Sequence, residues 1–124
     1  MPRPTRSKAR ILAFQIVYNR DKIGINQQGE DLLFRNSNLS KPYETFSQNL
    51  VNTTWQKLDE IDSAIKKHLI NWKQTRISDT LNALLRVATC ELLFFPETDS
   101  KVVFNEAIEI CRNYVDEKAT KLCN

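Results

Sequence analysis

Three arginines near the start of the chain are spaced in a way that suits a phosphate backbone. Arg3, Arg6 and Arg10 lie three and four residues apart, and at about 100° per residue they fall in one stripe of a helix. Arginine stays charged and presents a planar fork that matches phosphate oxygens. The stripe therefore predicts contacts with nucleic-acid phosphates. The alternative is an ordinary solvated basic terminus.

A row of apolar side chains follows on another side of the same helix. Ile11, Phe14 and Tyr18 recur at i, i+3 and i+7, opposite the positions expected to face the core. Large apolar residues exposed in one row usually mark a surface that binds another protein. The alternative is that other helices of the same chain cover the row, and the pattern alone leaves both possibilities open.

A third group of polar residues lies near the start of a helix in the last quarter of the chain. Asn105 and Glu106 occupy its first turns, where the helix dipole favours a carboxylate. For Glu106 we expect a role in stabilising the helix start and in hydrogen bonds within the protein. Asn105 faces away from the apolar stripe, so it remains a candidate for RNA contact, and Lys101 could reach a phosphate.

Catalytic chemistry finds no support in the sequence. The carboxylates of Asp59, Glu60 and Asp62 lie on one amphipathic helix and are typical of a solvated face. His68 is the single histidine, so a zinc cluster of cysteines and histidines is not expected. The chain lacks a P-loop, a Rossmann glycine set and a metal-binding spacing. We expect a binding protein without an enzymatic activity, cofactor or metal.

Length and composition indicate one small domain. The chain has 124 residues and a formal net charge of +3, so we expect residues 1–124 to form a single domain with its own core. Its three cysteines are an odd set and do not indicate a disulfide framework. Since no apolar run approaches the roughly 18 residues of a membrane span and no signal peptide is evident, we expect a cytoplasmic protein.

Apolar periodicity and capping residues predict an all-α bundle of about six or seven helices. The Asn26–Gln28 stretch reads as a loop, and Tyr114 is expected to face inward. Ser78 and Ser100 are predicted N-caps. The expected helices cover about 5–21, 31–35, a segment starting near Ser40 and Pro42, 56–72, the segment between Ser78 and Pro96, one starting at Ser100, and a last one from Asp116 to Asn124.

Segments at the two ends of the chain resemble the NusB family of transcription antitermination factors. The family patterns are R-x-x-A-R-x-x-A-x-Q-x-L-Y and V-x-N-E-A-x-E…K-F-V-N-G, and the resemblance extends over about residues 3–124. It implies two antiparallel three-helix bundles side by side. It also implies binding of single-stranded boxA RNA together with the ribosomal protein NusE, within the transcription elongation complex. The matching segments are Arg6-Ser7-Lys8-Ala9-Arg10-Ile11-Leu12-Ala13-Phe14-Gln15-Ile16-Val17-Tyr18, Val103-Phe104-Asn105-Glu106-Ala107-Ile108-Glu109 and Lys121-Leu122-Cys123-Asn124.

The resemblance also assigns roles to single positions. Tyr18 matches a family tyrosine near the surface that binds NusE. Leu122 replaces the family phenylalanine, whose ring could stack on a base, and Leu81 stands where an acidic residue is common. Lys118 and Lys121 add positive charge beside Leu122. The expected RNA contacts are therefore Arg3, Arg6, Arg10, Lys101, Asn105, Lys118, Lys121 and Leu122, and the expected protein contacts are Ile11, Phe14, Tyr18 and Leu81.

Two other functions remain open at this stage. NusB-like domains also form the N-terminal part of some RNA cytosine methyltransferases, and a helical module that binds only protein would show similar apolar rows. Compared with the family pattern, the sequence stops before the terminal helix is complete. We therefore expect residues from about Asp116 onward to be the least stable helical segment, because a short helix is marginal in isolation.

Overall fold

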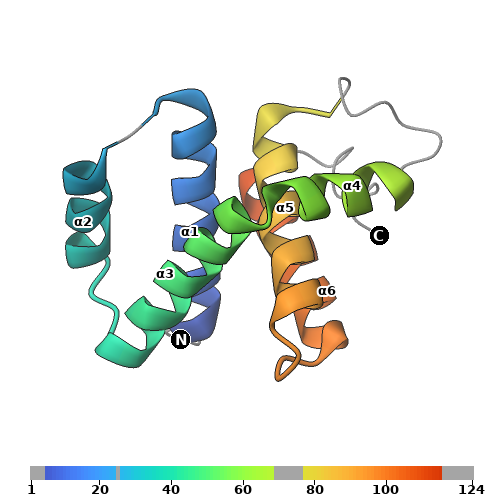
Figure 1. The fold of residues 1–124 in the computed structure, drawn as a ribbon. Helices are drawn as coiled ribbons and strands as arrows, with labels where there is room; N and C mark the ends of the chain where they lie inside the picture. The colour runs from blue at the N-terminus through green and yellow to red at the C-terminus, as the bar shows by residue number, and fades with distance from the viewer. Residues whose placement is uncertain (1–4, 25, 69–76, 116–124) are drawn as a thin grey trace.

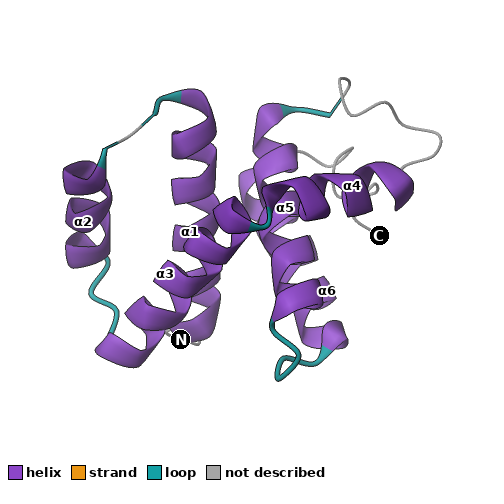
Figure 2. Ribbon diagram, viewed as in Figure 1, coloured by secondary structure: helices purple, strands orange, loops and turns teal. Residues whose placement is uncertain are grey.

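The structure, a computed structural model, describes residues 5–24, 26–68 and 77–115. These residues form helices joined by short loops, without a strand among them (Figure 2). The prediction of an all-α fold is confirmed. The helices are α1 (Thr5–Lys22), α2 (Gln27–Asn36), α3 (Lys41–Gln56), α4 (Leu58–His68), α5 (Asp79–Phe94) and α6 (Ser100–Tyr114).

The helices form two groups of three that lie side by side. In Figure 1, α1, α2 and α3 occupy the left half and α4, α5 and α6 the right half. Helix α1 packs against α3 and α5, and α5 also packs against α4 and α6. Helices α1 and α5 run in opposite directions, so α1 and α6 both begin at the lower end of the molecule (Figure 1). This end therefore brings together the first turns of α1, with Arg6 and Arg10, and the polar start of α6.

The apolar face of α1 forms the centre of the core. Ala9, Ala13, Ile16 and Val17 are fully buried, as their spacing of three and four residues predicts. They belong to one continuous cluster with buried residues from every other helix. The pattern on α6 is less regular than expected, since Tyr114 is 47% exposed rather than inward-facing.

Capping side chains fix several helix boundaries. The Ser78 hydroxyl accepts a hydrogen bond from the backbone N–H of Leu81, as predicted for an N-cap. The predicted loop at Asn26–Gln28 is wrong, because the Asn26 side chain caps a helix that already begins at Gln27. The N-cap of α6 is Asp99, one residue before the predicted Ser100.

Two predicted segments fall partly or wholly outside the described residues. Helix α4 begins at Leu58 and is described to His68, so the predicted continuation to residue 72 is not covered. The predicted last helix, from Asp116 to Asn124, lies outside the described residues.

Within the core, burial raises the pKa of the Cys90 thiol to about 11, which keeps this cysteine protonated and unreactive at neutral pH.

Candidate nucleic-acid interface and partner groove

Arg6 lies exposed on the first turns of α1. Its guanidinium carbon sits 4.4 Å from the centre of the Phe46 ring on α3, within the range of a cation–π interaction. Phe46 in turn meets Phe95 edge-on, with ring centres 5.8 Å apart. Phe46 therefore supports the Arg6 guanidinium while the residue stays open to solvent.

Arg10 does not share this exposed edge, and the prediction that it does is wrong. Its side chain is only 5% exposed. Nε and Nη2 donate hydrogen bonds of 2.8 and 2.7 Å to the two carboxylate oxygens of Glu91 on α5. Glu91 is itself 1% exposed. A buried carboxylate needs a paired cation, and Arg10 fills that role instead of facing a phosphate from the surface.

Glu106 links α6 to α1. Its carboxylate accepts a hydrogen bond from the Ser7 hydroxyl, and its Oε1 lies 3.5 Å from Nη1 of Arg10. The expectation of hydrogen bonds within the protein is therefore confirmed for Glu106. Asn105, the residue before it, is exposed, and so is Lys101 one turn earlier.

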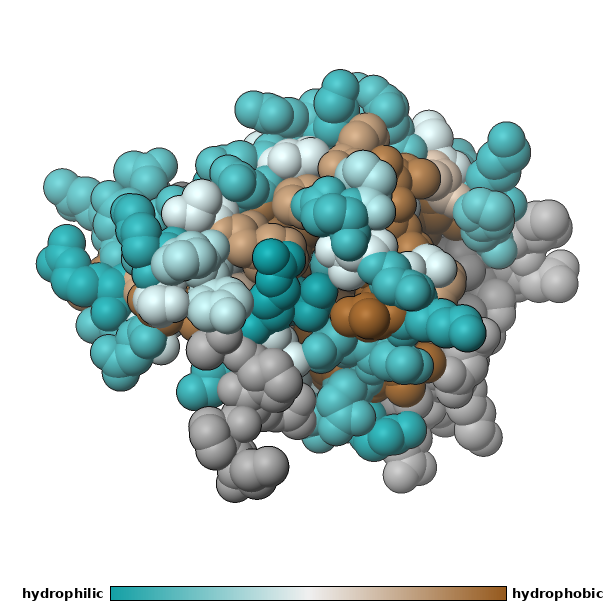
Figure 3. Space-filling view, turned by 90° about the horizontal axis from the view of Figure 1, so that it is seen from below, coloured by the Kyte–Doolittle hydropathy of each residue, from teal (hydrophilic) through white to brown (hydrophobic). Residues whose placement is uncertain are grey.

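The first turns of α1 and α6 both lie at the lower end of the molecule in Figure 1. Seen from below in Figure 3, this face is mainly hydrophilic, with a few hydrophobic areas between the polar side chains. Among the described residues, the exposed members of the expected RNA-binding set are Arg6 in the first turn of α1 and Lys101 and Asn105 in the first turns of α6. The remaining members of that set, Arg3, Lys118, Lys121 and Leu122, lie outside the described residues.

The apolar row of α1 is only partly accessible. Phe14 is 3% exposed, and its ring meets Tyr114 of α6 edge-on with ring centres 6.3 Å apart. Ile11 and Tyr18 are half-buried and pack against the core. Leu81 is 3% exposed and belongs to the core. The prediction of surface contacts is therefore wrong for Phe14 and Leu81, because Phe14 lies against Tyr114 of α6 and both side chains are buried.

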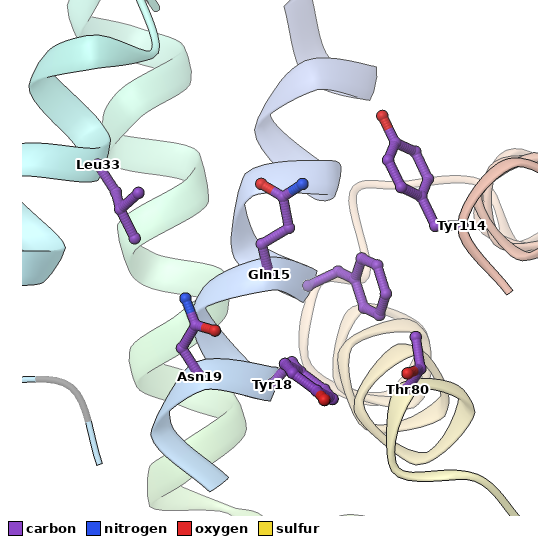
Figure 4. A pocket seen from close by; sticks show the side chains of 7 residues that line it. Gln15, Tyr18, Asn19, Leu33, Thr80 and Tyr114 are labelled. Carbon is purple, nitrogen blue, oxygen red and sulfur yellow. The ribbon is translucent and has the colours of Figure 1, made fainter. Parts of the chain in front are cut away.

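A groove of about 450 Å³ opens beside this row. Figure 4 shows Gln15, Tyr18 and Asn19 entering it from α1, with Leu33 of α2 on one side and Thr80 and Tyr114 on the other. The lining combines aromatic surface with amide and hydroxyl groups, which is the composition of many protein-binding surfaces. The sequence analysis missed Gln15 and Asn19, although their spacing of four places them together beside Tyr18.

No group of histidine, cysteine, aspartate and glutamate side chains suited to holding a metal ion occurs among the described residues. In the same part of the chain, none of the helices has the length and apolar character needed to cross a membrane.

Known proteins are similar to this sequence over most of its length. The NusB family model matches residues 7–124. A transcription antitermination protein NusB from Bacillus subtilis (strain 168) is 34% identical over 122 residues, covering 98% of this chain and 88% of the relative. One of the same name from Lysinibacillus sphaericus (strain C3-41) is 32% identical over 119 residues, covering 96% of this chain and 91% of the relative.

A solved structure is also similar to this fold. It contains the antitermination factors NusB and NusE in complex with double-stranded RNA. Its matching chain is 30% identical and superposes with a TM-score of 0.84, covering 96% of this chain and 89% of that chain.

Proposed function

The chain belongs to the NusB family, and on that premise we propose that it is an RNA-binding transcription antitermination factor that acts together with NusE. The observation that carries the proposal is the similarity of its fold to the chain solved in a NusB–NusE–RNA complex. In this role the protein contributes binding alone and no catalysis. The site of action is the transcription elongation complex during ribosomal RNA synthesis, and therefore the bacterial cytoplasm.

The lower end of the molecule supports the RNA-binding part of the proposal. Arg6, Lys101 and Asn105 are exposed there on α1 and α6. The two helices are joined by a hydrogen bond from Ser7, which follows Arg6, to Glu106, which follows Asn105. Cations at such a surface attract phosphates regardless of sequence, whereas amides such as Asn105 hydrogen-bond base edges. The proposed ligand is a boxA-type RNA, and Arg10 supports this surface from inside instead of contacting the RNA.

The groove beside Tyr18 supports the protein-binding part. It lies along the middle of α1 and is lined by aromatic, amide and hydroxyl side chains. We assign NusE to this groove, with Tyr18 and the 47% exposed Tyr114 as its main aromatic contacts. The RNA surface lies at the beginning of α1 and the groove lies along its middle, so both ligands can bind at the same time.

The proposal is tested by titrating fluorescently labelled boxA RNA with the protein, with and without purified NusE, at several salt concentrations. We expect the affinity for RNA to rise when NusE is added. We also expect the logarithm of the affinity to fall linearly with the logarithm of the salt concentration. Parallel titrations with single-stranded and double-stranded RNA determine which form is preferred. Failure to bind either RNA at low salt in the presence of NusE would contradict the proposed function.

A further inference from the structure

The two helices that present the proposed RNA surface are connected by residues directly next to the exposed ones. Ser7 on α1 donates a hydrogen bond to Glu106 on α6. Arg6 precedes Ser7 and Asn105 precedes Glu106, and both preceding residues are exposed. Each inward-facing member of the contact is therefore the sequence neighbour of an outward-facing candidate for RNA contact.

Arg10 and Glu91 stabilise this contact from the interior of the protein. Arg10 lies one helical turn after Ser7 and pairs with Glu91 of α5 through two hydrogen bonds. Its third nitrogen lies 3.5 Å from the same Glu106 oxygen that accepts from Ser7. Among the described residues, no buried side-chain nitrogen or oxygen lacks a hydrogen-bond partner. The network thus connects α1, α5 and α6 with its polar groups satisfied.

The network is buried at Arg10 and Glu91 and reaches the surface at Glu106. The Arg10 and Glu91 side chains are 5% and 1% exposed, whereas the Glu106 side chain is 21% exposed. Polar interactions are stronger in buried surroundings than at an open surface. The buried Arg10 guanidinium, which lies close to both Glu91 and Glu106, therefore helps to fix the relative position of the first turns of α1 and α6.

We infer that Ser7 and Glu106, with Arg10, form a clamp that positions Arg6 and Asn105 for one RNA molecule. The clamp residues are positioning residues and do not touch the RNA. This inference rests on the proposed RNA-binding function. Holding Arg6 and Asn105 in place before binding reduces the entropy lost when the RNA contacts both of them.

Two substitutions of Glu106 separate positioning from electrostatics. Glu106→Ala and Glu106→Gln both remove one negative charge near the RNA surface, and charge removal alone strengthens RNA binding. Only the glutamine retains an oxygen that accepts the Ser7 hydroxyl. We expect E106Q to bind boxA RNA at least as tightly as the wild type and E106A to bind about fivefold more weakly. Equal affinities of E106A and E106Q would overturn the clamp.

The Ser7 side of the contact provides a second arm of the test. S7A should weaken RNA binding without any change of charge, and the S7A/E106A double variant should bind no more weakly than E106A alone, because both remove the same interaction. Additive losses would overturn the inference. Glu97 is exposed in the turn before α6, so E97A serves as the matched control for loss of a carboxylate and should not weaken binding.

Hydrogen exchange reports on the clamp independently of RNA. In the absence of ligand, E106A should exchange faster than E106Q at the backbone amides of residues 8–11, while exchange in the middle of α5 stays unchanged. Unchanged exchange at residues 8–11 would overturn the clamp even if RNA affinity fell. Faster exchange in E106A together with a wild type that does not bind RNA would leave the clamp geometry standing, refute the proposed function and thereby refute the positioning role.

Discussion

The beginning and the middle of α1 present two differently built surfaces. At the beginning, Arg6 is exposed while Arg10 is buried against Glu91. In the middle, Tyr18 and Phe14 both line the open groove, but Tyr18 is half-buried whereas Phe14 is 3% exposed and meets Tyr114 edge-on. In both regions one residue of the predicted row supports the fold and its neighbour remains accessible. The comparison shows that a shared helix edge does not imply a shared role.

The physical cause differs between the two regions. Arg10 turns inward because a carboxylate on another helix, 81 residues away in the sequence, would otherwise be buried without a counter-charge. Phe14 is covered because the ring of Tyr114, the last residue of α6, meets it edge-on, and burying an aromatic ring is favourable wherever a neighbour is available. At the beginning of α1, an electrostatic requirement determines that Arg10 is buried. In the middle of α1, the packing of a neighbouring ring determines that Phe14 is buried.

The largest expected effect comes from breaking the buried pair at the beginning of α1. Glu91→Ala leaves the Arg10 charge buried with only the more distant Glu106 nearby, which should lower the free energy of unfolding by about 3–5 kcal/mol. Urea unfolding followed by circular dichroism measures this change. The double variant R10M/E91L replaces both charges with apolar groups and should recover most of the loss.

If E91A unfolds at the wild-type urea concentration, the pair contributes nothing and the contrast between Arg6 and Arg10 disappears. E97A is again the control, because Glu97 is exposed and its removal should change the free energy of unfolding by less than about 0.5 kcal/mol.

A second substitution tests the division of roles in the middle of α1. Phe14→Ala should destabilise the fold by about 3 kcal/mol, since it removes a buried ring. Urea unfolding measures the loss. A change of less than about 1 kcal/mol would show that Phe14 packs loosely and belongs to the groove more than to the core.

Tyr18→Asp probes the accessible member of the same region. It should weaken NusE binding by about tenfold or more, because it places a charge in an aromatic contact surface, while the helical circular dichroism signal stays near that of the wild type. Isothermal titration calorimetry with purified NusE measures the affinity. Unfolding of Y18D, rather than loss of NusE binding, would show that Tyr18 belongs to the core like Phe14.

Local features of the fold could be predicted from the sequence, whereas long-range pairing could not. The extent of α1 and the Ser78 cap follow from periodicity and capping chemistry, which act within one turn. The start of α2 was missed because Gly29 and neighbouring amides resemble a loop, although Asn26 caps them into a helix. The pairing of Arg10 depends on Glu91, and no local pattern connects these two residues.

The candidate site shows the same division. The exposure of Arg6, Lys101 and Asn105 follows from their positions on amphipathic helices. The burial of Leu81 and the exposure of Tyr114 depend on how α5 packs against α1 and on how α6 packs against α5. Residues such as Thr80 line the groove only because four helices converge there, and a single sequence contains no signal for that convergence.

The smallest expected effect distinguishes Arg6 from another exposed cation in the same turn of α1. If Arg6 contacts one phosphate, Arg6→Ala should reduce the slope of log affinity against log salt concentration by about one unit. Lys8 is also exposed but lies on a different side of the helix, so Lys8→Ala should leave the slope nearly unchanged. Arg6→Lys keeps the charge but loses the planar group that rests on Phe46. It should retain the slope while binding more weakly at every salt concentration. Equal slopes for R6A, K8A and the wild type would mean that the beginning of α1 contributes no phosphate contact, and that its exposed arginine, like the buried one, serves the fold.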